Sequence, residues 1–121
     1  MWSRTVETAV KLGFAVNRGS ADGKVVPAAD GTKPTFPVFS ERPDVGTIIA
    51  AGSTVAIVTD DGDREIYVIL GNIVTEFQFG MSDSNGAWIP ATTGNYTGVQ
   101  FLQSGVAGDV VKARAAQFKL P

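Results

Sequence analysis

Hydrophobic and polar residues alternate with a period of two along the first part of the chain. Between residues 5 and 16, one set of alternate positions holds Val6, Thr8, Val10, Leu12, Phe14 and Val16. A helix would place its apolar residues three and four positions apart, so the pattern predicts one β-strand over residues 5–16. Turn-forming residues follow at 17–23. A second strand is predicted at 24–27, ending at Pro27, because proline cannot donate to a strand ladder.

The centre of the chain has the longest run of β-forming residues. Residues 54–59 are almost entirely apolar, which indicates a strand buried on both faces. Asp60-Asp61-Gly62-Asp63 is typical of a hairpin turn, and residues 64–70 would form the returning strand. After Gly71-Asn72 the alternation resumes through residue 79. The pattern therefore predicts a three-stranded meander over residues 54–79.

The remaining segments complete an all-β pattern in which no stretch favours a helix. Further strands are expected at 99–102 and 110–115, long loops at 28–46 and 80–98, an N-terminal arm at 1–4 and a C-terminal tail at 116–121. Short strands at such spacing are typical of closed or stacked sheets. We predict that residues 1–121 form a single all-β domain, a compact β-barrel or β-sandwich with long loops and extended termini.

The chain contains no histidine and no cysteine. Those two residues supply most general bases, thiol nucleophiles and zinc ligands, so carboxylate pairs are the main remaining route to catalysis. Glu65 and Glu76 are candidates for such a pair across the meander, but charged strand residues usually face solvent. We therefore predict that the protein is not an enzyme and has neither catalytic residues nor a cofactor.

Three carboxylates gather at the predicted hairpin turn. Asp60, Asp61 and Asp63 could offer oxygen ligands to Ca²⁺, yet their spacing lacks the ordered ligand positions and the distal glutamate of a calcium loop. Short acidic side chains are also common in turns because they bond to the local backbone. The favoured interpretation is an acidic turn, and no metal site is predicted.

The charge of the chain is low and evenly spread. Ten basic and twelve acidic residues give a net charge of −2, and 18% of residues are charged, against about 25% in typical domains. Without a basic cluster, nucleic acid is not an expected partner. The apolar runs are too short to span a bilayer, so a membrane is not expected either. A largely neutral surface costs little to desolvate against a protein partner.

Aromatic and large apolar residues in the predicted loops and termini are the candidate contacts with a partner, because such side chains bury much area at low entropic cost. The predicted interface residues are Trp2, Arg4, Phe36, Phe39, Phe118 and Leu120. Two interpretations stay open for each terminus. Trp2 belongs either to a disordered end or to an arm buried on a neighbouring subunit, and the tail docks either on its own domain or on a neighbour.

Short sequence phrases resemble those of the small capsid decoration, or head-cement, proteins of tailed bacteriophages. The stretch ADGKVVPA at residues 21–28 resembles one near the start of such proteins. Residues 98–102 followed by AGDVVK at 107–112 resemble their C-terminal pattern, and AGSTV at 51–55 fits between them. The resemblance covers most of the chain and brings no catalytic motif.

This resemblance implies a small β-rich protein that binds the outside of an icosahedral shell and stabilises it. The expected partners are the major capsid protein and further copies of the chain, in a homotrimer. The expected location is the capsid surface of the virion, after synthesis in the host cytoplasm.

Two other functions remain as alternatives. A ligand-binding module of the carbohydrate type would use Trp88 and Tyr96 to stack on sugar rings. A small hydrolase would need two carboxyl groups with perturbed pKa values in a deep pocket.

Overall fold

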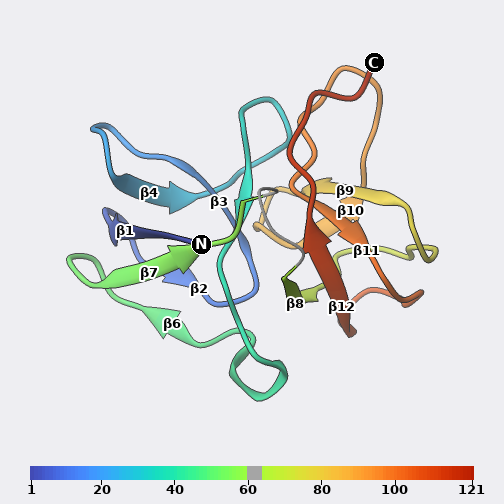
Figure 1. The fold of residues 1–121 in the computed structure, drawn as a ribbon, viewed down its shortest axis with the longest axis horizontal. Coiled ribbons are helices and arrows are strands. Elements are labelled where there is room, and N and C mark those ends of the chain that lie inside the picture. The colour runs from blue at the N-terminus through green and yellow to red at the C-terminus, as the bar shows by residue number, and fades with distance from the viewer. Residues whose placement is uncertain (60–63) are drawn as a thin grey trace.

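Two curled β-sheets, one from each half of the chain, make up the molecule (Figure 1). The computed structural model describes residues 1–59 and 64–121. Over these ranges the only helical element is a single 3-10 turn, η1 (Arg42–Asp44). The all-β prediction is therefore confirmed, and each sheet is curled towards a barrel.

The first sheet has the strand order β5, β3, β4, β1, β7. Its strands are β1 (Trp2–Val6), β3 (Ala15–Arg18), β4 (Lys24–Pro27), β5 (Phe36–Pro37) and β7 (Thr54–Ile57). A ribbon of β2 (Val10–Lys11) and β6 (Ile48–Ile49) accompanies it. A bridge between Val38 and Ile57 joins the end of β5 to β7. The first sheet therefore curls until its two edges meet.

The second sheet repeats this arrangement with the strand order β10, β9, β11, β12, β8. Its strands are β8 (Glu65–Ile69), β9 (Phe79–Ser82), β10 (Trp88–Pro90), β11 (Val99–Phe101) and β12 (Val110–Ala115). A bridge between Leu70 and Trp88 joins its two edges. The bridge closes this sheet at one point, and the outer edge of β8 also bonds to the first half of the chain, where the Tyr67 and Ile69 N–H groups donate to Ser40 and Gly13.

Each curled sheet encloses its own apolar core. The first core contains Val6, Val10, Val16, Val25, Val38, Val55 and Ile57. The second contains Ile66, Val68, Leu70, Val74, Trp88, Val99, Phe101, Val111, Ala113 and Ala115, and it also takes in Ala15, Ala28 and Val58 from the first half of the chain. The second core therefore extends across the junction between the sheets.

Trp88 lies at this junction and is fully buried. Its indole N–H donates to the carbonyl of Gly13 over 3.1 Å. The ring packs on Gly98, where an added Cβ would come within 2.5 Å of the indole. The backbone N–H of Ile69 also donates to Gly13, over 3.4 Å. One aromatic side chain and the backbone around it thus connect the two halves of the protein.

The single strand predicted over residues 5–16 is wrong, because the segment contains β1, β2 and the start of β3. The backbone turns at Gly13, whose φ of +79° favours glycine. Val6, Val10 and Val16 are nevertheless buried, as the alternation indicated, whereas Thr8 is exposed. Period-two alternation identified most of the buried positions but could not show where the chain bends between them.

The predicted meander over residues 54–79 is also wrong, because β7 and β8 belong to different sheets. β7 pairs with β1 on one side and bridges to Val38 on the other. β8 pairs with β12, and on its other side the N–H of Tyr67 donates to the Ser40 carbonyl over 3.3 Å. Both backbone edges of β7 and of β8 therefore bond to other segments, and the two strands do not pair with each other. The turn proposed at residues 60–63 lies outside the described residues.

Four shorter strands were placed correctly, whereas the expected loops and arm contain structure. β4 and β12 match their predicted ranges, β11 ends one residue early, and β8 begins one residue late and ends one residue early. The expected loop at 28–46 contains β5 and η1, and that at 80–98 contains most of β9 and all of β10. The expected arm at 1–4 is mostly strand β1, paired with β7. The tail at 116–121 bonds to residues 94–97, including Leu120 N–H to Asn95 carbonyl at 2.9 Å.

Replacing Trp88 by alanine is expected to lower the free energy of unfolding by about 3–5 kcal/mol, because it leaves a cavity at the junction and removes the bond to Gly13. Urea titration followed by circular dichroism measures the change. Trp2→Ala is the matched control, since Trp2 is 48% exposed, and its loss should be clearly smaller. Equal losses from the two variants would contradict the role given to Trp88.

Candidate functional site

The first sheet has an apolar inner face that extends beyond its core to one open end. Strand register places Trp2 and Arg4 on the same face as Val55 and Ile57, because Trp2 pairs with Ile57 and Arg4 with Val55. At the open end this face forms a hollow of about 290 Å³. The hollow, called the mouth groove below, is lined by Trp2, Arg4, Arg18, Asp22, Gly23, Lys24, Val25, Phe36 and Ile57.

The groove brings together three of the six predicted interface residues: Trp2, Arg4 and Phe36. The Arg4 guanidinium lies 4.9 Å from the centre of the Trp2 ring, within the range of a cation–π contact. Its Nη1 also donates to the Ser3 carbonyl over 2.8 Å. Phe36 is partly buried against the first core. The groove thus has two aromatic walls and a cation held over one of them.

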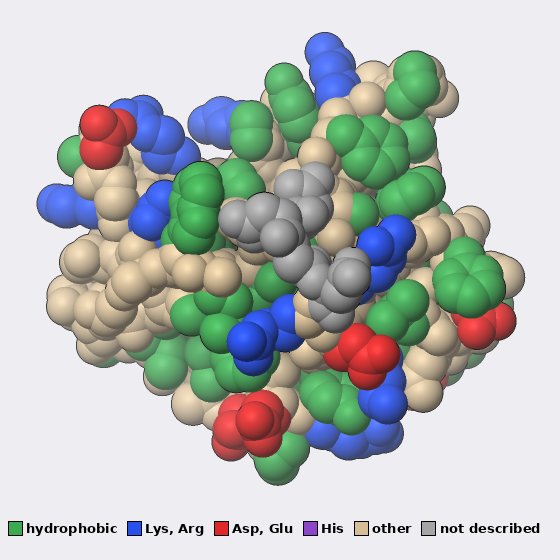
Figure 2. Space-filling view, in the orientation of Figure 1, with side chains coloured by type: hydrophobic (Ala, Val, Ile, Leu, Met, Phe, Trp, Pro, Cys, Tyr) green, Lys and Arg blue, Asp and Glu red, His purple; other side chains and the backbone are tan. Residues whose placement is uncertain are grey.

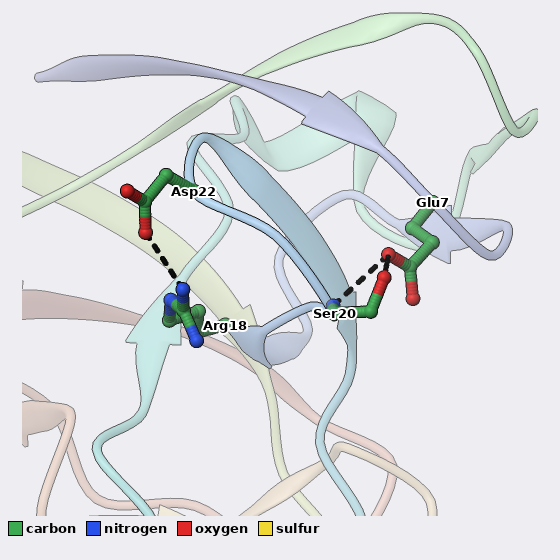
Figure 3. A network of polar contacts seen from close by, with 4 residues as sticks. All are labelled: Glu7, Arg18, Ser20 and Asp22. Atoms are coloured by element: carbon green, nitrogen blue, oxygen red, sulfur yellow. Dashed lines mark hydrogen bonds and ion pairs between the residues drawn. The ribbon is translucent and has the colours of Figure 1, made fainter.

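The charged residues of the groove are mostly basic. Arg4 and Arg18 carry positive charges, and Asp22 is the single acid among the lining residues. Lys24 also lines the groove, but it pairs with Thr5, so its side chain lies on the outer face of the sheet, near Glu7. The Arg18 guanidinium donates to Asp22 over 2.6 Å, which lowers the pKa of that carboxyl below its ordinary value (Figure 3). In Figure 2, basic side chains gather around this end of the first sheet. The groove therefore carries a net positive charge although the chain as a whole has −2.

The turn between β3 and β4 forms one wall of the groove and is anchored by Glu7. The Ser20 hydroxyl and backbone N–H both donate to the Glu7 carboxylate, at 2.5 and 3.0 Å (Figure 3). These bonds lower the pKa of Glu7 from its ordinary value of 4.5, with a smaller contribution from the charge of Lys24. Glu7 thereby fixes the turn that carries Asp22 and Lys24.

The other three predicted interface residues lie elsewhere. Phe39 packs against the second core, with the Arg64 guanidinium 5.6 Å from its ring centre. Phe118 is 37% exposed and makes an edge-to-face contact with Phe79, the ring centres being 4.8 Å apart. Leu120 lies in the tail that pairs with residues 94–97. The interpretation that the tail docks on its own domain is therefore correct.

The pair proposed for sugar stacking is not available as a platform. Trp88 is fully buried, so neither face of its ring can meet a ligand. Tyr96 is partly exposed, with the Lys119 ammonium 5.8 Å from its ring centre. Its backbone N–H donates to the Gly31 carbonyl over 2.7 Å. The alternative of a carbohydrate module loses its main residue because the β10 segment is interior rather than a surface loop.

The carboxylates considered for catalysis or metal binding do not form a site in the described structure. Glu65 lies 3.9 Å from the Lys112 ammonium in a partly exposed ion pair. The backbone N–H of Glu76 bonds to the Ser104 hydroxyl in a different region. Across residues 1–59 and 64–121 no group of three or more acidic side chains is placed to hold a metal. Asp60, Asp61 and Asp63 lie outside these ranges.

Two basic residues of the groove escaped sequence reasoning. Arg18 lies inside the predicted turn at 17–23, and Lys24 directly follows it. The register pairs Arg18 with Val25, which places Arg18 on the inner face, whereas the side chain of Lys24 lies on the outer face. This register is set by the hairpin and could not be read from the sequence pattern. The described residues also contain no helix with the length and hydropathy needed to cross a bilayer.

Comparison with known proteins finds a similarity of fold to a solved structure. No protein-family profile matches the chain, and no curated protein matches it. The crystal structure of the head fiber gp8.5 N base of bacteriophage phi29 superimposes with a TM-score of 0.63. The superposition covers 99% of this chain and 96% of that one, at 13% sequence identity. The two proteins therefore share a fold over their whole lengths.

Replacing Glu7 by glutamine is expected to destabilise the protein more at neutral pH than in acid. Because the folded-state pKa of Glu7 is depressed, its stabilisation is present above about pH 4.5 and is lost as the pH falls through the folded value. Urea midpoints at pH 7 and about pH 3 measure the difference between Glu7→Gln and the unaltered chain. A difference of the same size at both pH values would contradict this role for the carboxylate.

Proposed function

We propose that this protein is a non-enzymatic structural component of a bacteriophage head. It binds the outer surface of the icosahedral shell and stabilises the shell as a decoration, or cement, protein. Its partners are the major capsid protein and further copies of itself, with three copies in the bound unit. It is made in the host cytoplasm and resides on the virion.

The observation that carries the proposal is the fold shared, over almost the whole chain, with the base of a phage head fiber. The sequence phrases at 21–28, 51–55 and 98–112 support the same class independently of the fold. On this proposal the base of a head fiber and a cement protein have the same physical task, which is to attach to the surface of a phage head. Both need a rigid body and exposed contact surfaces rather than a reaction centre.

The surface features of the described residues suit this task. The mouth groove offers aromatic walls and cations at one end of the first sheet. Large apolar side chains are also exposed elsewhere on the molecule, among them Ile48, Ile73, Phe77 and Val106. Protein interfaces are anchored by such groups. A protein that binds only the mature form of the shell stabilises that form by mass action, and the stabilisation grows with the logarithm of the free protein concentration.

Purified chain is expected to bind saturably to mature heads of the phage that encodes it and to raise the temperature at which those heads release DNA. Co-sedimentation measures binding, and a dye-release melt measures stability. Heads lacking bound protein are the baseline, and heads of an unrelated phage are the specificity control. No saturable binding to its own heads, or binding without any gain in head stability, would overturn the cement function.

A further inference from the structure

A second exposed feature, here called the apolar tip, lies at the end of two loops of the second sheet. It consists of Ile73, Phe77 and Val106, which are 65%, 60% and 53% exposed. The loops are paired: Val74 bridges Gly105, and the Phe77 N–H donates to the Phe101 carbonyl over 2.7 Å. The bridge sets Ile73 opposite Val106, and the second bond holds the turn that carries Phe77 on the same pair of loops.

The backbone at Phe77 is held in an unfavourable conformation. Its φ is +72°, and it is the one residue besides glycine with a positive φ in the described chain. The Gln78 N–H donates to the Thr75 carbonyl over 3.1 Å, so Phe77 occupies the third position of a turn. Glycine or asparagine usually fills that position in turns with this geometry. Such strain, held by surrounding bonds, is typical of functional positions.

The surrounding bonds fix where the phenyl group stands. The Gln100 amide donates to the Phe77 carbonyl over 3.0 Å, and the Ser104 hydroxyl accepts from the Glu76 N–H over 3.0 Å. An exposed carboxylate, Glu76, therefore stands next to an exposed phenyl ring. Asp109 caps the neighbouring loop by accepting from the Val106 N–H, and it shares a nearby hollow with Arg42.

The tip and the mouth groove are complementary in chemistry. The tip presents a phenyl ring with an adjacent negative charge. The groove presents an apolar hollow between Trp2 and Phe36, with the guanidinium groups of Arg4 and of Arg18, the latter paired with Asp22, around it. A phenyl ring buried in such a hollow would place its neighbouring carboxylate among these cations, where charge complementarity favours the correct orientation.

We propose that the Phe77 tip of one copy inserts into the mouth groove of a second copy. The groove belongs to the first sheet, whereas the tip loops lie on the side of the second sheet away from it (Figure 1). The contact is therefore head-to-tail: each copy offers one tip and one groove. Repetition of such a contact closes into a ring when the rotation between copies permits. It needs no shell, so it can be tested apart from head binding.

Analytical ultracentrifugation of the purified chain over a concentration series is the primary test. The unaltered chain is expected to associate, and Phe77→Asn is expected to weaken association at least roughly tenfold. Asparagine tolerates a positive φ, so at concentrations where both proteins are monomeric this variant should unfold at the same or a higher temperature than the unaltered chain. Ile48→Ala is the matched control, because Ile48 is 67% exposed but belongs to neither surface.

A mixing experiment tests whether tip and groove meet each other. Trp2→Ala keeps the tip and loses a groove wall, and Phe77→Asn keeps the groove and loses the tip. Each variant alone should be largely monomeric, whereas an equimolar mixture should form a dimer that grows no further. A monomeric unaltered chain, an unaffected Phe77→Asn variant, or a mixture that associates no better than its components would each overturn the proposal. Weakening by Trp2→Ala with no effect of Phe77→Asn would also overturn it, because the groove would then hold a segment of the second copy other than the tip.

Discussion

The contact between Trp88 and the backbone around Gly13 is the constraint on which the rest of the structure depends. The indole fills the space between two curled sheets and donates its only polar hydrogen across the junction. Gly98 has no side chain to obstruct the ring. Because neither sheet has a large core of its own, the shared apolar volume around the indole makes one cooperative body from two small ones.

The mouth groove follows from the curl of the first sheet. A strand such as β1 places alternate residues on the inner face along its whole length, but the core fills only one end of that face. Val6 is buried in the core, and Arg4 and Trp2 on the same face extend past it to the open end. Pockets at the mouths of barrels arise in this way. Most of the residues that line this groove belong to paired strands, and the turn between β3 and β4 adds Asp22 and Gly23.

Sequence patterns correctly predicted the strands that can be recognised from their own residues and from the turns beside them. β4 and β12 were placed correctly because turn residues bound them and β-forming residues fill them. The meander failed because β7 and β8 each find partners far along the chain, and alternation carries no information on which strand pairs with which. Trp88 was misplaced because the prolines and glycines around it resemble a surface loop. Half of the candidate contact residues met in one groove, since β1 and β5 bring the N-terminus beside Phe36.

The bridges at Val38–Ile57 and Leu70–Trp88 have a consequence for how this protein can associate. With its principal sheet edges satisfied internally, the described structure offers little backbone for another chain to extend a sheet by strand addition. Contacts between molecules must then be made mainly by side chains. Such contacts form and separate without any unfolding, so any assembly that contains this protein can be built one subunit at a time, with misplaced subunits leaving again before it is complete.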